Sequence, residues 1–309
     1  MNISSLGNFG IITKKIFNSN SEYPEEKFIT KMLYKNDSDE INISNIVRKI
    51  NNYDKFFCPL LDESHTVLIM FTKEWYDYIE RIRLYRDLYA YACFNGGYDL
   101  TVILNNDTFS YQFSKYHNNL KQILNMIKHL TNGIYYLHKN NIVHNDIKLE
   151  NIVCNLDKSC SLKIIDFGLS DIHPFKKFLT KPLGTNGYIP INNSNFECIY
   201  KLNPNDWIKH NNYIHISSIT NNKKLVFKTD IFCLGIVLKI IIDDIFESGV
   251  YGSNINNFDS YKYNLLEKSN YLKIKFILEY MLKENVVERY NSEDILNMIN
   301  TNVEKCYIL

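Results

Sequence analysis

The stretch IVHNDIKLENIVCNL, residues 142–156, is the most informative part of the sequence. It places an acid, a base and an amide, Asp146, Lys148 and Asn151, within six residues and between two apolar runs that are typical of strands. Charged groups that are shielded from water are costly unless other charges or hydrogen bonds compensate them. The stretch therefore predicts a loop that holds three polar side chains together for a binding or catalytic task.

Two short strands are predicted next, NIVCNL (151–156) and SLKIID (161–166), around the polar turn DKSC. The second strand ends in Asp166, with Phe167 and a flexible Gly168 behind it. Paired strands return the chain on itself, so Asn151 and Asp166, at the two ends of this hairpin, are expected to converge. An amide oxygen and a carboxylate form a hard-oxygen site that suits Mg²⁺, which accepts few protein ligands beside water and phosphate.

The remainder of the chain divides into a strand-rich first third and a helix-rich part. Apolar residues alternate with polar ones over 10–17 and 26–34, which predicts strands, and residues 87–100 read as a strand that ends in a Gly-Gly break. Helical spacing of apolar residues predicts helices over 39–50, 118–138, and near 230–242, 271–283 and 292–300. The break at Gly96-Gly97 is the best boundary between two lobes.

The pattern HxDxKxxN followed by DFG resembles the catalytic and metal-binding signature of eukaryotic-type protein kinases. The resemblance runs from about residue 3 to about residue 300. LGTNGYI (183–189) resembles the substrate-docking end of the activation segment, KTDIFCLGIVL (228–238) the central helix whose Asp230 braces the catalytic loop, and ERYNSEDIL (288–296) the closing segment with Arg289. The implied fold is α+β and bilobal, one kinase domain with a small β-rich N-lobe at 1–95 and a mainly helical C-lobe at 96–309.

The resemblance assigns roles to the residues of the opening stretch. Asp146 orients the substrate hydroxyl and accepts its proton, and Lys148 supports the charge on the transferring phosphoryl group. Asn151 and Asp166 hold Mg²⁺, and His144 is a buried structural histidine. The implied cofactors are ATP and Mg²⁺, and the implied partners are protein substrates, which are modified on Ser or Thr because of Lys148 and the Gly-Thr-x-Gly-Tyr run.

The nucleotide-binding residues are expected mainly in the first third. The stretch that resembles the glycine-rich phosphate loop and the strand after it is Ser5, Leu6, Gly7, Asn8, Phe9, Gly10, Ile11, Ile12 and Thr13, with Ser5 where the first glycine usually stands. The resemblance makes Lys31 the lysine that grips the phosphates, with Lys27 and Lys35 as alternatives. Ile29, where the family prefers Ala, shares a strand face with Lys31 and is expected to crowd the adenine.

Three further contacts follow from the resemblance. The helix should supply a carboxylate partner for Lys31, but the apolar spacing puts the family's glutamate near Ile43. Glu40, one turn earlier, is the candidate, and Asp39 and a residue of the inserted segment 62–86 are alternatives. Residues 90–93 should run beside the adenine, and Asp99 is expected to bond the ribose.

The sequence also departs from the family pattern. Asn145 stands where many members have Arg, which predicts activity that does not wait for loop phosphorylation, although Ser170, Thr180 and Thr185 are present. Pro190-Ile191-Asn192 replaces Ala-Pro-Glu, so Arg289 is expected to use a substitute partner such as Glu197 or to be exposed. An insertion at 193–229 borders the docking region. The eroded glycine loop, the missing helix glutamate and the lost Ala-Pro-Glu keep an inactive pseudokinase scaffold open as the alternative, whereas the docking run disfavours a small-molecule kinase.

Composition limits the remaining possibilities. The 309 residues are 45% apolar and 22% charged with a formal charge of +1, which excludes a disordered chain and gives no field for nucleic acid or anionic membrane. Seven cysteines without a CxxC pair predict reduced thiols, and no secretion signal is visible, so a cytoplasmic location is expected. The longest apolar run, 231–242, contains Lys239 and predicts a buried core helix. The abundance of Asn, Ile, Lys, Tyr and Phe indicates an AT-rich genome, such as that of a protist or a large DNA virus. The sequence gives no indication of the oligomeric state.

Overall fold

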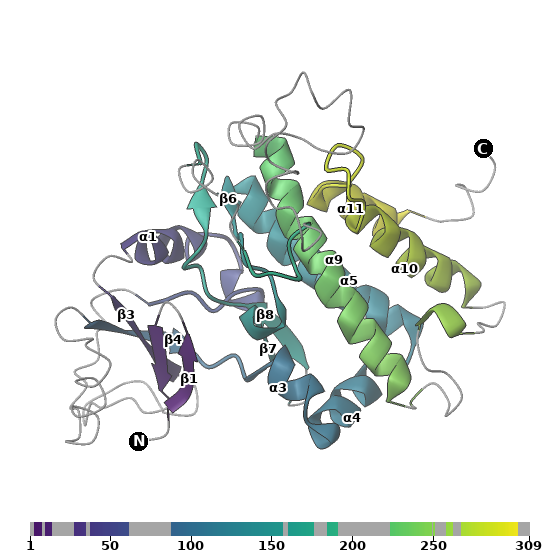
Figure 1. The fold of residues 1–309 in the computed structure, drawn as a ribbon, viewed down its shortest axis with the longest axis horizontal. Helices are drawn as coiled ribbons and strands as arrows, with labels where there is room; N and C mark the ends of the chain where they lie inside the picture. Colours follow the sequence, from purple (N-terminus) through teal and green to yellow (C-terminus); the bar gives the residue numbers. More distant parts are fainter. Residues whose placement is uncertain are drawn as a thin grey trace. The chain divides into compact units, whose positions relative to one another are not determined.

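The computed structural model describes part of the chain, and its contacts group the chain into two compact units. The described residues are 3–7, 10–13, 28–34, 38–61, 88–156, 160–175, 184–190, 223–248, 250, 258–261 and 267–301. One unit comprises residues 1–96 with 165–170, and the other comprises 97–164 with 171–309. The first is built on a β-sheet and the second is mainly helical (Figure 1), which confirms the α+β class.

The sheet of the first unit is antiparallel and four-stranded. Its strands, in spatial order, are β1 (Ile3–Gly7), β2 (Gly10–Thr13), β3 (Phe28–Tyr34) and β4 (Leu88–Phe94). Gly7 pairs with Gly10 across β1 and β2, and Lys31 on β3 pairs with Ile12 on one side and Tyr91 on the other. The predicted strands are confirmed within 10–13 and 28–34, whereas 14–27 lies outside the described residues.

Helix α1 (Ser38–Val47) supplies the helical face of the first unit and ends a little before the predicted boundary. Ile43 and Val47 are buried, as the apolar spacing predicts. Glu40 lies one turn before Ile43 and Ser44 on the same face, and it is buried as well, with 2% of its surface exposed. The inward stripe of α1 therefore begins with a carboxylate. A short 3₁₀ helix, η1 (Tyr53–Lys55), follows α1.

The second unit contains the remaining elements. Its helices are α3 (Leu100–Leu104), α4 (Asp107–Tyr116), α5 (Leu120–Lys139), α9 (Lys223–Glu247), α10 (Lys268–Met281) and α11 (Ser292–Asn300), with the 3₁₀ turns η3 (Leu149–Asn151) and η5 (Phe258–Ser260). Two small antiparallel sheets join β5 (Tyr98–Asp99), β7 (Ile152–Asn155) and β8 (Ser161–Ile164), and β6 (Ile142–Val143) with β9 (Asp171–Ile172). The predicted helices and the 151–166 hairpin are confirmed.

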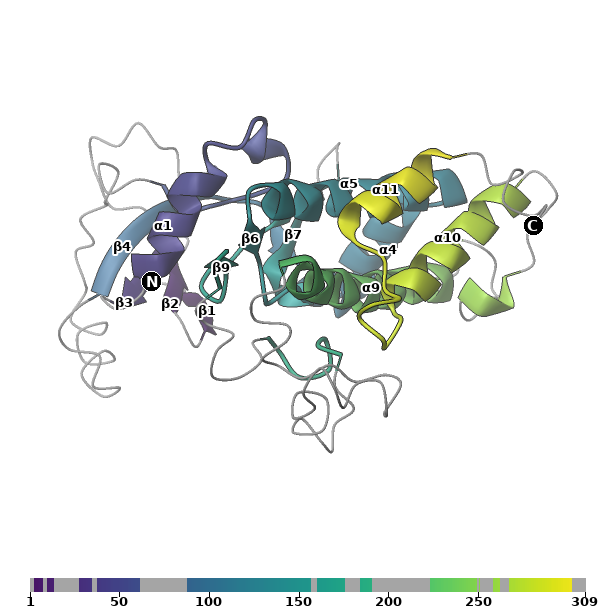
Figure 2. The ribbon, with the colours of Figure 1, turned by 90° about the horizontal axis from the view of Figure 1, so that it is seen from above.

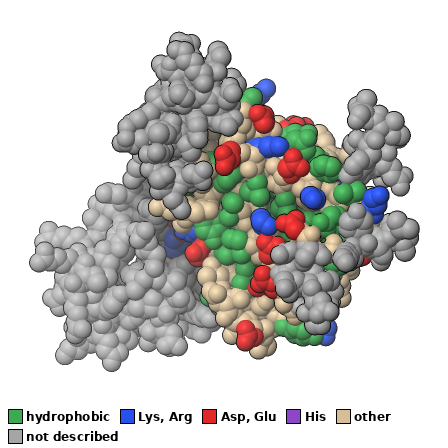
Figure 3. Space-filling model, turned by 45° about the vertical axis from the view of Figure 1, so that its right-hand side comes forward, with side chains coloured by type: hydrophobic (Ala, Val, Ile, Leu, Met, Phe, Trp, Pro, Cys, Tyr) green, Lys and Arg blue, Asp and Glu red, His purple; other side chains and the backbone are tan. Residues whose placement is uncertain are grey.

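Helices α5 and α9 form the core of the second unit (Figures 1 and 2). The predicted apolar stripe of α5 is buried, and Ile123, Ile127 and Ile134 have no exposed surface. Helix α9 is apolar on most sides because it packs against α4, α5 and α10, which confirms the buried core helix. None of the described helices combines the length and apolar composition needed to cross a bilayer. On the face drawn in Figure 3, acidic and basic side chains are interspersed among apolar ones.

Arg289 is buried, and backbone carbonyl groups bind its guanidinium. It is 1% exposed, so the prediction of an exposed side chain is wrong, and Glu197 lies outside the described residues. Its guanidinium donates to the carbonyl oxygens of Lys283 (2.9 Å), Lys228 (3.0 Å) and Glu284 (3.1 Å). The charged group also lies 4.7 Å from the centre of the Phe232 ring. Backbone carbonyl groups thus accept hydrogen bonds from this buried cation, and a carboxylate partner for it stays a prediction.

Replacing Arg289 by Ala is expected to lower the free energy of unfolding by about 3 kcal/mol or more, because hydrogen bonds from charged groups contribute about 1.5–3 kcal/mol each. Urea denaturation would measure the loss. Arg289→Lys keeps the charge but not the planar fork, so it should recover only a minor part. Full stability in both variants would show that the carbonyl contacts do not hold this region.

Candidate active site

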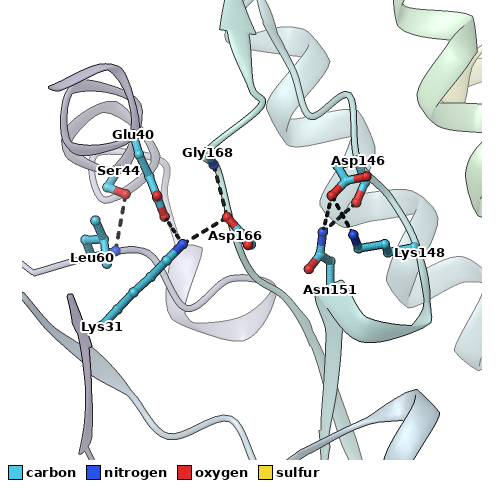
Figure 4. A network of polar contacts seen from close by, with 9 residues as sticks. All are labelled: Lys31, Glu40, Ser44, Leu60, Asp146, Lys148, Asn151, Asp166 and Gly168. Atoms are coloured by element: carbon cyan, nitrogen blue, oxygen red, sulfur yellow. Dashed lines mark hydrogen bonds and ion pairs between the residues drawn. The ribbon is translucent and has the colours of Figure 1, made fainter. Parts of the chain in front are cut away.

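Lys31 is the centre of a polar cluster in the first unit. Its ammonium group lies 2.7 Å from Glu40 Oε1 and 2.9 Å from Asp166 Oδ1 (Figure 4). Lys31 comes from β3 and Glu40 from α1, while Asp166 belongs to the 165–170 segment that groups with this unit. The structure thus brings together the predicted phosphate-gripping lysine, its candidate helical partner and one predicted metal ligand.

The charge of Lys31 is stabilised although the side chain is only 7% exposed. Burial by itself lowers the pKa of the ammonium group, but the nearby carboxylates of Glu40 and Asp166 outweigh it and hold that pKa well above its ordinary value. The group therefore stays protonated at any physiological pH. A fixed cation of this kind can bind an anion such as a nucleotide phosphate.

The segment around Asp166 belongs with the first unit, although the predicted boundary assigned all of 96–309 to the second. Phe167 is fully buried, and its ring lies 6.1 Å from that of Phe57 in an edge-on arrangement. Asp166 accepts a hydrogen bond from the Gly168 amide at 3.2 Å, has a left-handed backbone with φ +66°, and keeps 30% of its side chain exposed. Long-range packing of Phe167 and the bond to Lys31 explain the difference.

Asp146 is the centre of a second polar cluster, in the second unit (Figure 4). Lys148 Nζ lies 3.0 Å from Asp146 Oδ2 and donates to Thr185 Oγ1 at 3.0 Å. The Thr185 hydroxyl in turn donates to Asp146 Oδ1 at 2.7 Å. Asp146 is 7% exposed, and these neighbours hold its carboxylate in one orientation. A carboxylate placed in this way can accept a proton from a hydroxyl group.

Asn151 is oriented by the same carboxylate. Its amide nitrogen donates to the Asp146 carbonyl oxygen at 2.8 Å and to Asp146 Oδ2 at 2.9 Å. Both bonds use the NH₂ group, so the amide oxygen points away from Asp146 (Figure 4). The oxygen is the half of the amide that binds a hard cation.

A buried aspartate of α9 fixes the backbone of the catalytic loop. Asp230 has no exposed surface and accepts hydrogen bonds from the amides of His144 at 2.8 Å and Asn145 at 2.9 Å. Asn145 adopts a left-handed backbone with φ +68°, which Asn tolerates better than most residues. His144 is fully buried and its Nδ1 accepts from the Asp146 amide at 3.3 Å, in keeping with the expected structural histidine.

The 184–190 turn contributes Thr185 to the cluster around Asp146. It also contains Gly184 and Tyr188 of the docking run. Gly184 has φ +125°, and a Cβ there would lie 2.5 Å from Ile189 Cγ2 and 2.9 Å from the Asn145 carbonyl oxygen, so only glycine fits. Tyr188 is half-buried, and this burial raises the pKa of its hydroxyl.

Ser170 is fully buried, which removes it from the phosphorylation sites considered above, and Thr180 lies outside the described residues.

The other predicted residues are placed only in part. Ser5, Leu6, Gly7, Gly10, Ile11, Ile12 and Thr13 lie on the paired strands β1 and β2, while Asn8, Phe9, the 62–86 insertion, Lys27 and Lys35 lie outside the described residues. Residues 90–93 lie on β4. Asp99 caps helix α3 by accepting from the Val102 amide at 2.9 Å, a structural task that the sequence analysis did not assign to it.

Sequence reasoning missed one member of this network. His138, in the last turn of α5, lies 3.0 Å from Asp230 Oδ2 through its Nε2 and stacks on Phe227 at 4.5 Å. Within the sequence this histidine looks like an ordinary helix end. The only signal that could have found it is the position of Asp230, whose partners come from segments far away in the chain.

A fixed cation on a sheet strand and an oriented carboxylate in a loop before a hairpin, in an α+β fold, are features expected of the protein kinase class. A family model described as "Protein kinase domain" matches residues 24–192, just over half of the chain. The chain belongs to the protein kinase family, which confirms the resemblance and the kinase-like fold.

Curated relatives match shorter stretches. The chain is 42% identical over 59 residues to "NUAK family SNF1-like kinase 1" of Mus musculus, covering 19% of this chain and 9% of the relative. It is 44% identical over 66 residues to "Calcium-dependent protein kinase 4" of Plasmodium falciparum, covering 21% and 12%. It is 40% identical over 63 residues to "SNF1-related protein kinase catalytic subunit alpha KIN12" of Arabidopsis thaliana, covering 20% and 12%. The matches thus span about a tenth of the length of these relatives.

Proposed function

We propose that the chain is an active serine/threonine protein kinase, which transfers the γ-phosphoryl group of Mg-ATP to Ser or Thr hydroxyls of protein substrates. The observation that carries the proposal is the bonded set of Asp146, Lys148, Asn151 and Thr185, whose mutual contacts fix the orientation of each side chain. Phosphoryl transfer asks little covalent work of the protein, so positioning and electrostatics supply most of the rate. The named kinases among the relatives support the class.

Each residue has a specific task in this proposal. Asp146 hydrogen-bonds the substrate hydroxyl, orients its oxygen and accepts its proton as the bond to phosphorus forms. Lys148, held beside Asp146, offsets negative charge on the transferring group. Lys31 holds the α- and β-phosphates, and Glu40 holds Lys31 in place. The strands with Ser5 to Thr13 cover the phosphates, and Asp99 binds the ribose.

The donor set of the chain suits Mg²⁺. The Asn151 amide oxygen and the Asp166 carboxylate are hard ligands, and among the described residues no group of three or more His, Cys, Asp or Glu side chains forms a metal site. Mg²⁺ keeps most of its coordination for water and phosphate, so one amide and one carboxylate suffice. Bound there, the ion would neutralise charge on the β- and γ-phosphates.

Asp146 does not depend on a phosphorylated loop in this proposal. Treatment with a phosphatase is expected to leave activity nearly unchanged, because Asn145 cannot dock a phosphate as Arg does and Thr185 already bonds Asp146 and Lys148. Radiolabelled phosphate incorporation into a generic substrate, before and after treatment, measures the effect. A loss of more than tenfold would reject independence from phosphorylation.

A scaffold without catalysis is the second candidate, because Ser5 replaces a glycine of the phosphate loop and Ile29 adds bulk near the adenine. One experiment separates the two. The purified chain is incubated with Mg-ATP and generic Ser- and Thr-containing proteins, and phosphate incorporation is compared with that of Asp146→Asn. Transfer that depends on Asp146 supports the kinase. Nucleotide binding without any such transfer supports the scaffold. The proposal includes a cytoplasmic location, which accords with the reduced thiols of four described cysteines, Cys58, Cys154, Cys160 and Cys233.

A further inference from the structure

Two buried cysteines meet in the hairpin that follows Asn151. Cys154 Sγ on β7 lies 3.4 Å from Cys160 Sγ, and the two residues are 0% and 6% exposed. Neither sulfur is part of a disulfide. Neither residue takes part in the polar clusters described above, so the contact is not explained by phosphoryl transfer.

The strand register explains why the two sulfurs meet. Cys154 pairs with Leu162, and Asn155 pairs with Ser161, across β7 and β8. Cys160 lies just before β8, two residues from Leu162, and so diagonally across from Cys154. Its backbone is left-handed, with φ +42°, where the chain enters β8. The fold, and not the sequence separation alone, selects this pair.

We propose that Cys154 and Cys160 form a reversible disulfide in the folded protein when it meets a peroxide. A disulfide needs the sulfurs about 2.05 Å apart, so a small rotation of the side chains is required. Cys160, at the edge of the buried region, reacts first. In an otherwise reducing compartment such bonds are transient and act as redox sensors.

The chemistry balances with peroxide as the oxidant. The Cys160 thiolate attacks one peroxide oxygen, the O–O bond breaks, and a sulfenic acid and one water result. The Cys154 sulfur then attacks Cys160 Sγ and displaces hydroxide, which leaves as the second water with the Cys154 proton. The two thiols lose two electrons and two protons, and the peroxide is reduced to two waters. A small-molecule thiol reverses the step by exchange.

Cys233 offers a contrast within the same unit. It is 2% exposed, burial raises the pKa of its thiol, and it lies on helix α9 and not in the β7–β8 hairpin. It serves as a control cysteine that shares the burial of the pair but has a different place in the fold. Oxidation of Cys233 at the same rate as Cys160 is not expected.

The test treats the folded chain with hydrogen peroxide, blocks remaining thiols by alkylation and digests it with trypsin without reduction. Cleavage after Lys148, Lys158 and Lys163 puts Cys154 on peptide 149–158 and Cys160 on peptide 159–163. The expected product is these two peptides joined, at least tenfold above any pair that includes Cys233, and separated again by a thiol reductant. Cys154→Ala and Cys160→Ser should each abolish the product, and Cys233→Ala should retain it.

Two results would overturn the proposal. One is that both thiols are alkylated after peroxide treatment, or carry separate oxygen adducts, with no joined peptide. The other is that the joined peptide forms as fast in denaturing guanidinium chloride as in the folded chain, which would mean that sequence separation alone produces it. The readout is independent of kinase activity, so its outcome and that of the phosphotransfer assay are separate.

Discussion

Changing Asp146 to Asn is expected to lower the turnover of phosphoryl transfer by on the order of 10²–10³ while leaving the fold intact. Asn has nearly the shape of Asp but cannot accept the substrate proton, and it lacks the charge that holds Lys148 at 3.0 Å. The loss should appear in kcat more than in KM for ATP, because Asp146 acts on the acceptor hydroxyl.

The control for this variant is Asp107→Asn on α4, an exposed carboxylate in a first helical turn. It removes the same charge from the same unit but should change turnover by less than about twofold, as surface substitutions usually have small effects. Circular dichroism and thermal melts check that both variants are folded. Equal turnover of Asp146→Asn and the wild type would remove the catalytic assignment and favour the scaffold.

Changing Lys31 to Met is expected to weaken Mg-ATP binding and to lower the free energy of unfolding by about 3–5 kcal/mol, because it leaves a carboxylate that is 2% exposed without its cation. Glu40→Gln should cost less, since the ammonium group keeps its contact of 2.9 Å with Asp166. Urea denaturation and nucleotide titration measure the two effects.

The assignment of Glu40 has its own control. Asp39→Asn removes the neighbouring exposed carboxylate of α1, the alternative partner in the sequence analysis. It is expected to leave the nucleotide affinity within experimental error and to lower the free energy of unfolding by less than about 1 kcal/mol, the usual limit for an exposed acid in a first helical turn. Equal losses in Asp39→Asn and Glu40→Gln would indicate that the register of α1 differs from the one described.

Local patterns made the centre of the site predictable. Asp146, Lys148 and Asn151 lie within six residues, so a loop of ordinary length keeps them close together. The helices are predictable for a similar reason, because the α5 stripe repeats over several turns and its burial is a property of one segment. Glu40 was harder, since the apolar residues of α1 favoured a position one turn later in the helix.

Contacts between distant segments were not predictable in the same way. The carbonyl oxygens that hold Arg289 belong to backbone groups, which every residue has, so no residue type indicates them. The grouping of residues 165–170 with the first unit depends on Phe167 meeting Phe57, and no local pattern contains that pair. The contact between Cys154 and Cys160 likewise depends on strand register and not on a cysteine motif.

The hydrogen bonds between Asp230 and the loop that contains Asp146 limit which variants of α9 the protein tolerates. Because Asp230 on α9 holds the backbone amides of residues 144 and 145, a change that displaces this helix also displaces Asp146, the proposed catalytic carboxylate. Gly235 is such a point, since a side chain there would press on Met281 and Leu282. Natural variants in the interior of α9 should therefore be screened for impaired phosphate transfer, even though they touch neither nucleotide nor substrate.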